Sequence, residues 1–203
     1  MKMYTPLSVA VRFIAYSFLL FGVAEIIKLD ALYPMEDGYY GEISFTEFSQ
    51  EILLFAVFIL YMVAGLKLRI LQPVTNILSL VFLASFIREF NFIIPFWIYM
   101  VLPVLLIILW LLIRDYKKIK PAAAVFFSMP ASAWFFSGFL LTYIFSRLMG
   151  RSSFWLILYD ESNYRLAKAA VEEGIELAGD AILLISAIEL LLSIRQRIRK
   201  EQE

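Results

Sequence analysis

Six long apolar stretches dominate this sequence and leave it few folds to adopt. Each has about 19 or more residues, enough at ~1.5 Å per residue to cross a hydrocarbon core of roughly 30 Å. Backbone polar groups in lipid must be satisfied within the chain, so such stretches cross as helices. We therefore predict an all-α, polytopic membrane protein, with one transmembrane domain over residues 1–203. Its six helices are expected at about 7–27, 46–67, 73–90, 95–114, 121–148 and 166–193.

Composition agrees with a lipid environment and excludes several chemistries. The chain is 62% hydrophobic, with a mean hydropathy of +0.81, against roughly 45–50% apolar residues in soluble proteins. Its formal net charge of zero argues against a nucleic-acid partner. Histidine and cysteine are absent, so haem ligation, zinc sites and thiol nucleophiles are excluded, and any bound metal must have oxygen ligands. We expect no cofactor, and the bilayer is the expected partner.

Local signals mark several helix ends. Ser44 followed by Glu47 reads as a capping box before the second span. Pro73, Pro95 and Pro121 each stand where the first turn of a helix tolerates a missing N–H.

The positions of lysine and arginine predict the orientation, because short basic loops stay in the cytoplasm. Both termini are therefore expected inside, in a multi-pass protein of a bacterial inner membrane. The outer side would carry 14 of the 18 acidic residues, including those of the 30–51 loop, Asp30, Glu36, Asp37, Glu42, Glu47 and Glu51. The inner side would carry 12 of the 18 basic residues, namely Lys2, Arg12, Lys67, Arg69, Arg114, Lys117, Lys118, Lys120, Arg195, Arg197, Arg199 and Lys200.

The last predicted helix has a charged face and a small-residue face. The charges of its outer half fall on an arc of about 140°, given 3.6 residues per turn; they are Arg165, Lys168, Glu172, Glu173, Glu176 and Asp180. Asp180 lies ~12 Å inside the outer edge, too deep to face lipid. The opposite face, with Ala170, Gly174, Ala178 and Ala181, would let another helix approach closely, in this chain, a second copy or a partner.

Charges at the outer ends of the second and third predicted spans, together with those of the last helix, predict a charged cluster that opens outward. Arg88 is the expected counter-ion, because a guanidinium can bridge two carboxylates and stays charged when buried. Acids outnumber bases, so the cluster could bind protons or a cation, with Glu51, Glu176 and Asp180 as a possible carboxylate site. The alternative is that these groups only reach the aqueous boundary or fix helix pairing. The cluster comprises Glu51, Arg88, Glu89, Asn91, Glu172, Glu173, Glu176 and Asp180.

Three further features are weaker signals. Pro103 and Pro130 predict kinks in the fourth and fifth spans, where the serines of 128–133 could satisfy freed carbonyls. Residues 152–159 are apolar but too short to span, and are expected either in the outer interface or as a re-entrant piece. Arg12 can reach the inner headgroups, and Glu189 is a candidate partner for it.

Two short motifs resemble a family. Phe-Ile-Arg-Glu-Phe-Asn at 86–91 and Val-Glu-Glu-Gly-Ile-Glu-Leu at 171–177 are similar to a pairing in uncharacterised bacterial inner-membrane proteins. Those proteins have an Arg-Glu-apolar-Asp helix end, where this chain has Asn91. The resemblance implies that the two motifs belong to one site, and it implies no activity.

Three functions are compatible with these patterns. In the first, a transporter or channel binds a cation or proton in the cluster. In the second, an enzyme or flippase acts on a lipid-linked phosphate at the outer leaflet, held by Arg88, Arg147, Arg151 and Arg165. In the third, the chain is a non-catalytic subunit, anchor or immunity-type partner that associates through Ala170, Gly174 and Ala178.

Overall fold

The computed structural model describes residues 5–35, 38–41, 43–92, 94–161 and 163–202, and within them the protein is helical with no β-strand. Lys2, Glu36, Asp37 and Glu42 lie outside the described residues. The elements are α1 (Pro6–Leu32), α2 (Phe45–Lys67), α3 (Gln72–Glu89), η1 (Phe90–Phe92), α4 (Trp97–Arg114), α5 (Tyr116–Phe127), α6 (Ala131–Leu140), η2 (Leu141–Phe145, a π-helical turn), α7 (Ser146–Met149), α8 (Ser152–Trp155) and α9 (Tyr164–Gln202).

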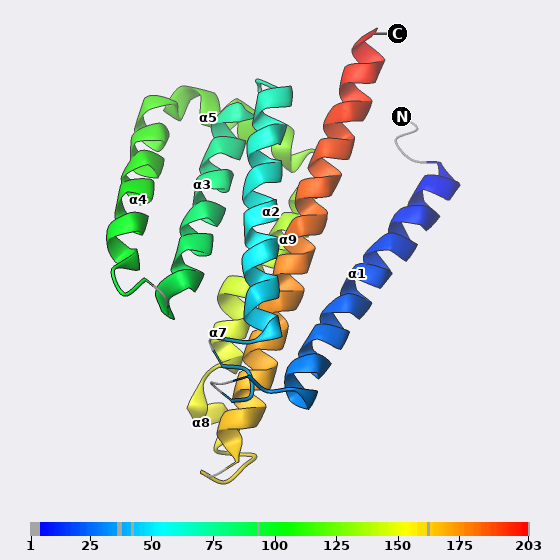
Figure 1. Cartoon of the computed structure of the whole chain (residues 1–203). Coiled ribbons are helices and arrows are strands. Elements are labelled where there is room, and N and C mark those ends of the chain that lie inside the picture. Colours follow the sequence, from blue (N-terminus) through cyan, green and yellow to red (C-terminus); the bar gives the residue numbers. More distant parts are fainter. Residues whose placement is uncertain (1–4, 36–37, 42, 93, 162, 203) are drawn as a thin grey trace.

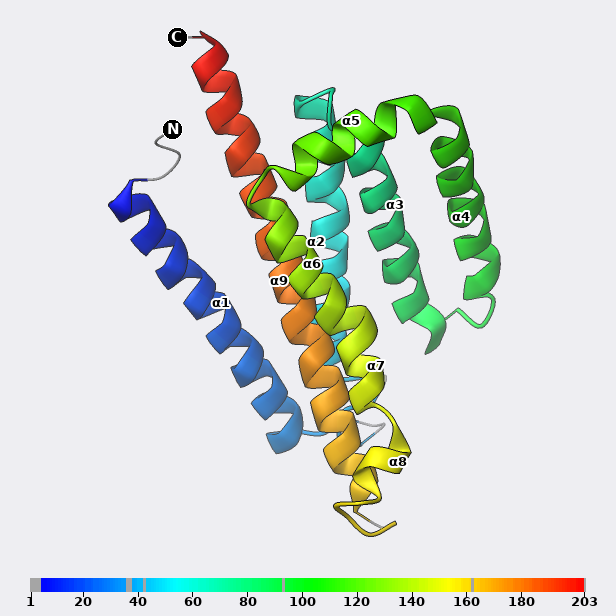
Figure 2. The same cartoon turned by 180° about the vertical axis from the view of Figure 1, so that it is seen from behind.

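The long helix α9 forms the centre of the bundle. It has 39 residues, and α1, α2 and α6 pack around it (Figures 1 and 2). Leu183, Ala187, Leu190 and Ile194 on α9 are fully buried. Its apolar residues therefore face protein, whereas those of α1 and α4 are largely exposed, as expected of helices that contact lipid.

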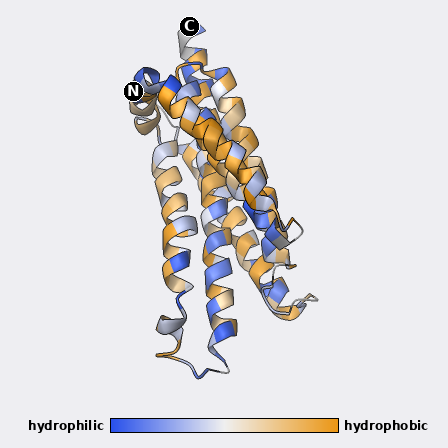
Figure 3. Cartoon of the chain, turned by 90° about the vertical axis from the view of Figure 1, so that its left-hand side faces the viewer, coloured by the Kyte–Doolittle hydropathy of each residue, from blue (hydrophilic) through white to orange (hydrophobic). Residues whose placement is uncertain are grey.

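Both termini lie at one end of the bundle, here called the terminal end (Figure 1). The α2–α3 and α4–α5 junctions lie there too, so Lys67, Arg114 and Lys118 belong to this end. Lys67 lines a pocket with Arg195 and Arg199 of α9. The α1–α2 loop, α8 and the start of α9 lie at the other end, here called the opposite end. Hydrophobic ribbon predominates along the middle of the long helices, and hydrophilic segments lie toward their ends (Figure 3).

Among the described residues, four helices are long and apolar enough to cross a membrane: α1, α2, α4 and α9. A fifth is added if α5 and the α6–α7 segment are counted as one broken span. The 18-residue α3 is less apolar, since it begins with Gln72 and ends with Arg88 and Glu89. The all-α prediction is confirmed and the apolar helices are compatible with a membrane protein, but the six-span count and the sides of the termini are not confirmed.

The helix expected over 121–148 is instead two helices bent by 98°. The chain breaks at Pro130, and α5 lies across the terminal end while α6 to α7 run along α9 (Figure 2). Ser128 Oγ donates to Val125 O at 2.7 Å and Ser132 Oγ to Met129 O at 2.8 Å, so serine hydroxyls satisfy carbonyls at the break, as predicted. Because α5 begins at Tyr116, the prediction that Pro121 starts a helix is wrong.

Other local predictions can be compared directly. Ser44 caps α2 and accepts from Glu47 N at 3.2 Å, which confirms this cap, and Pro73 lies in the first turn of α3. Pro95 precedes α4, which begins at Trp97. Residues 152–159 form the short α8 and turns at the opposite end, beside the start of α9.

Candidate cation-binding pocket

A polar pocket of about 450 Å³ opens at the opposite end of the bundle, where α2, α3, α7 and α9 approach one another. Carboxylates, guanidinium groups and two aromatic rings share its wall. We call it the acidic pocket; it is lined by Tyr40, Gly41, Glu47, Arg88, Glu89, Asn91, Trp97, Arg147, Glu173 and Glu176. The two motifs of the family resemblance therefore contribute to one pocket, through Arg88, Glu89 and Asn91 from the first and Glu173 and Glu176 from the second.

Arg147 from α7 is the main cation facing α9. Its Nη1 lies 3.0 Å from Glu172 Oε1, and its Nη2 lies 3.0 Å from Glu176 Oε1 and 3.1 Å from Oε2. Lys168 Nζ lies 3.7 Å from Glu172 Oε2. Arg147 thus bridges two carboxylates one helical turn apart, the role that the sequence analysis gave to Arg88.

Arg88 pairs with its own neighbour in the chain. Its Nη2 and Nε lie 2.5 Å and 3.2 Å from Glu89 Oε1. No bridge from Arg88 to a second carboxylate occurs among the described contacts, so the expectation that it spans two acids is not met. Both groups still face the pocket, where Glu176 is close enough to Arg88 to act on it electrostatically.

Two further carboxyl groups face the pocket from α2 and α9. Glu47 of α2 and Glu173 of α9 both line its wall. Gln50 Nε2 donates to Glu173, at 3.1 Å to Oε2. Two ionised carboxylates in one wall repel each other, so a bound proton or cation would stabilise this part of the pocket.

Asp180 lies deeper and faces protein, as predicted, with only 1% of its surface exposed. Thr142 Oγ1 donates to Asp180 Oδ1 at 3.0 Å. Thr142 stands on the π-helical turn η2, and Gly179 allows this turn to approach, since a Cβ there would lie 2.8 Å from Thr142 N. Gly138 on α6 likewise allows a close approach to α9, because a Cβ there would lie 2.8 Å from Gly179 O.

Two buried oxygens accept no hydrogen bond among the described residues. They are Oε1 of Glu51, a residue that is 8% exposed, and Oε1 of Glu176. The Glu176 oxygen forms an ion pair with Arg147 Nη2 at 3.0 Å but accepts no hydrogen bond from it. No group of three or more acidic side chains in the described part of the chain is arranged to hold a metal ion. The carboxylate site proposed for Glu51, Glu176 and Asp180 therefore stays a prediction without a matching arrangement.

The remaining predicted phosphate ligands lie apart from this pocket. Arg151 and Arg165 are exposed, near α8 and the start of α9. Arg88 and Arg147 are both occupied by carboxylates. The four arginines do not converge on one anion site.

Several polar residues of this region were not singled out from the sequence. Asp30, expected in the acidic outer loop, is buried and caps α2, accepting from Phe45 N at 2.7 Å and Thr46 N at 2.8 Å. Tyr40 OH donates to Ile27 O at 3.2 Å, and its burial, together with the charge of Asp30, raises its pKa. Asp30 lies within α1, fifteen residues before Phe45, so no local sequence pattern indicated this contact, and Tyr40 gave no signal either.

The small-residue face of α9 is used inside the chain. A Cβ at Gly174 would lie 3.2 Å from Ile27 Cδ1 of α1, and Ala178 and Ala181 pack with Val23 of α1. A second copy or a partner protein associating through Ala170, Gly174 and Ala178 remains a prediction, and it would require α1 to leave part of this face.

A second charged region lies on α9 nearer the terminal end. Arg12 Nη1 donates to Glu189 Oε2 at 2.7 Å, which confirms the predicted pairing, and Tyr16 OH donates to Glu189 Oε1. Glu189 is buried and both of its oxygens accept a hydrogen bond. We call these three residues the Arg12–Glu189 latch.

The fold and the pocket together define a class: an all-helical protein with four to five apolar helices, compatible with membrane integration, and with charged groups inside the bundle. Comparison of the chain with protein-family models, curated proteins and solved structures finds no match.

Proposed function

We propose that this chain is an integral membrane protein that binds protons or a small cation in the acidic pocket and moves them across the bilayer. The supporting observation is charge imbalance. Four carboxyl groups line the pocket with only two guanidinium groups, Arg88 and Arg147. The carboxyl groups are those of Glu47, Glu89, Glu173 and Glu176.

This imbalance favours a cationic ligand. An ionised carboxylate in a site of low dielectric is costly unless it is paired, protonated or bound to a cation. Arg147 is shared between Glu172 and Glu176, and Arg88 is occupied by Glu89, so Glu47 and Glu173 have no cation of their own among the described contacts. A proton or a bound cation would supply the missing positive charge.

Two irregular elements in the α5–α7 segment supply a basis for a change of access. The chain breaks at Pro130, and the π-helical turn η2 carries Thr142, which holds Asp180. Broken helices and π-helical turns recur at functional sites of membrane proteins, because they can change their hydrogen bonding at low cost. A change in η2 would alter the partner of Asp180.

The proposed topology has six crossings, with α3 and the α6–α7 segment as the two that are less apolar or broken. The basic residues at the terminal end support a cytoplasmic location for both termini, in a bacterial inner membrane. The acidic pocket would then open outward.

The test is proton and cation flux into proteoliposomes under an imposed gradient. We expect the Glu176→Gln, Asp180→Asn double variant to lose flux by at least tenfold, because it removes two buried carboxylates from the proposed path. Glu25→Gln is the matched control, since Glu25 is half-exposed and lies outside the pocket, where it pairs with Lys28 at 3.0 Å. Flux that is equal in wild type and the double variant, with both inserted and monodisperse, would refute the proposal.

The two other functions receive less support. A lipid-phosphate enzyme or flippase would need arginines free to bind phosphate, and Arg88 and Arg147 are paired with acids. A non-catalytic subunit has no specific observation in its favour. Absence of flux in wild type would direct attention to partner proteins.

A further inference from the structure

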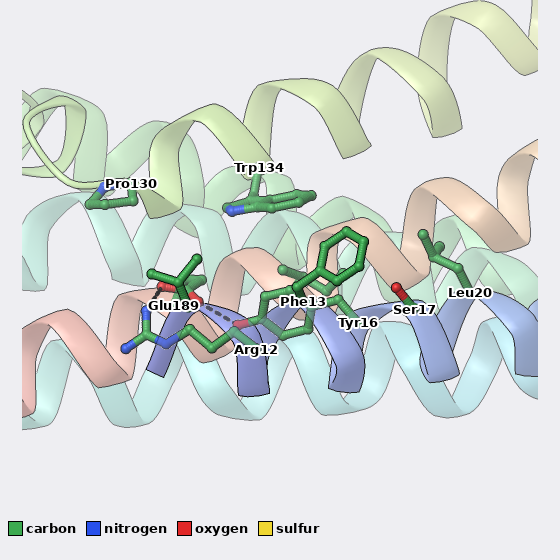
Figure 4. Close-up of a pocket in the computed structure, with 10 residues that line it drawn as sticks. Arg12, Phe13, Tyr16, Ser17, Leu20, Pro130, Trp134 and Glu189 are labelled. Carbon is green, nitrogen blue, oxygen red and sulfur yellow. Dashed lines mark hydrogen bonds and ion pairs between the residues drawn. The ribbon is translucent and has the colours of Figure 1, made fainter. Parts of the chain in front are cut away.

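A second cavity lies near the terminal end, far from the acidic pocket. It is a groove of about 420 Å³ between α1 and α6, with α9 as its floor (Figure 4). We call it the α1 groove. It is lined by Val9, Arg12, Phe13, Tyr16, Ser17 and Leu20 of α1, by Pro130 and Trp134 at the start of α6, and by Ile185 and Glu189 of α9.

The groove exists because α1 packs on the bundle mainly through its second half. There, Val23 lies in a core with Leu177 and Ala181 of α9. The first half of α1 contacts the rest of the bundle through the Arg12–Glu189 latch and through an edge-to-face contact of Tyr16 with Trp134. The ring centroids of Tyr16 and Trp134 are 5.9 Å apart. Between these links the walls are apolar and open, and Phe13 is 72% exposed.

The length of the groove matches half of a bilayer. From Val9 to Leu20 is eleven residues, or ~17 Å along the helix axis, which is about half of a hydrocarbon core of roughly 30 Å. The groove therefore spans one leaflet, the one at the terminal end, and stops near the midplane. At this depth the surrounding solvent is acyl chain, and an apolar cavity does not hold water.

Hydrogen-bond donors predominate among the polar side chains of the groove. Arg12 and Trp134 have donors only, Tyr16 OH donates to Glu189, and the Ser17 hydroxyl can donate or accept. Both carboxylate oxygens of Glu189 already accept, from Arg12 and Tyr16. A ligand that complements these groups has an apolar chain and oxygen acceptors at one end. In Figure 4, Arg12 and Glu189 lie at the Pro130 end of the groove and Leu20 at the other.

We propose that the α1 groove binds one acyl chain of a phospholipid from the leaflet at the terminal end, with the ester and phosphate oxygens of that lipid facing Arg12. The lipid fills the gap between α1 and α6 that protein leaves open. This inference is independent of the proposed transport function, because it uses none of the residues of the acidic pocket.

The first experiment is native mass spectrometry of the full chain after delipidation and titration with dioleoylphosphatidylglycerol. We expect one lipid per chain to be retained in a saturable step. Ser17→Phe places a ring in the groove and should weaken that step at least tenfold. Ala15→Phe is the matched control: it adds the same ring to an exposed position of α1 outside the groove, and should leave the step unchanged.

Two outcomes would overturn the proposal. One is equal retention by Ser17→Phe and Ala15→Phe with both variants folded, as judged by thermal unfolding. The other is a distribution of many weakly held lipids in wild type without a single saturable step, which is annular lipid only. Hexadecane tests the oxygen acceptors: it should not compete with the phospholipid, and competition at equal concentration would refute the role of Arg12.

Discussion

Helix α9 carries two charged regions that differ in their balance of charge. In the Arg12–Glu189 latch one carboxylate faces one guanidinium, and both carboxylate oxygens accept hydrogen bonds. In the acidic pocket, about four turns away along α9, four carboxyl groups face two guanidinium groups, and Glu176 has an oxygen without a hydrogen bond. Both Glu189 and Glu176 are buried.

This difference separates a structural pair from a candidate site. Because a buried pair whose partners are all satisfied gains nothing from a further charge, the latch has no need of a cation. An acid-rich group is at its lowest free energy only when protons or cations are bound. Although each region contains a buried glutamate of α9, we therefore predict that removing a carboxylate changes the free energy of unfolding in opposite directions in the latch and in the acidic pocket.

The largest expected effect is at the latch. Glu189→Leu removes the carboxylate that Arg12 and Tyr16 contact, and should lower the free energy of unfolding by about 3 kcal/mol, the usual cost of leaving a charge buried without its partner. Adding Arg12→Leu should restore stability to within ~1 kcal/mol of wild type. Denaturant unfolding in detergent measures both, and a double variant no more stable than the single would show that the latch is not a coupled pair.

A smaller effect of opposite sign is expected in the acidic pocket. Glu173→Gln keeps a side-chain oxygen that can accept from Gln50 Nε2. Since it also removes one of several like charges, it should raise the free energy of unfolding by roughly 0.5 kcal/mol at neutral pH. Glu189→Gln is the isosteric control and should be destabilising. If both substitutions lower stability alike, the charge imbalance does not govern the pocket.

The same comparison shows what the sequence predicts well. Apolar length predicts the long helices, a local pattern predicts the Ser44 cap, and Glu189 is a candidate partner for Arg12 from the sequence alone. The burial of Asp180 followed from its distance to the helix end. These inferences need only periodicity, rise per residue and the cost of charge in lipid.

The counter-ion of the acidic pocket could not be predicted in this way. A π-helical turn adds a residue to one turn of a helix, which shifts the phase of every later residue by about 100°. The turn η2 precedes Arg147, so helical periodicity from Pro130 onward gives no reliable direction for its side chain. The break at Pro130 adds a second change of direction, and its 98° angle depends on the packing of α5 across the bundle end. Tertiary contacts fix both features.

The smallest expected effect is at a carboxylate that lies outside the predicted spans and is paired with basic neighbours. Asp115, between α4 and α5, accepts from Arg114 Nη2 at 2.5 Å and Nε at 3.0 Å, and from Lys118 Nζ at 3.2 Å. The Arg114 hydrogen bonds, followed by those of Lys118, hold its pKa below the usual value for aspartate.

A depressed pKa in the folded state means that Asp115 contributes stability above its unfolded pKa of about 3.9, and that this contribution is lost as pH falls through the folded value. Asp115→Asn should therefore be mildly destabilising at pH 7, and its difference from wild type should shrink toward zero as the pH is lowered below about 4. Thermal unfolding of both proteins from pH 7 to pH 3 measures that difference. A difference that does not change with pH would mean that Asp115 contributes to stability through packing and not through its ionised carboxylate.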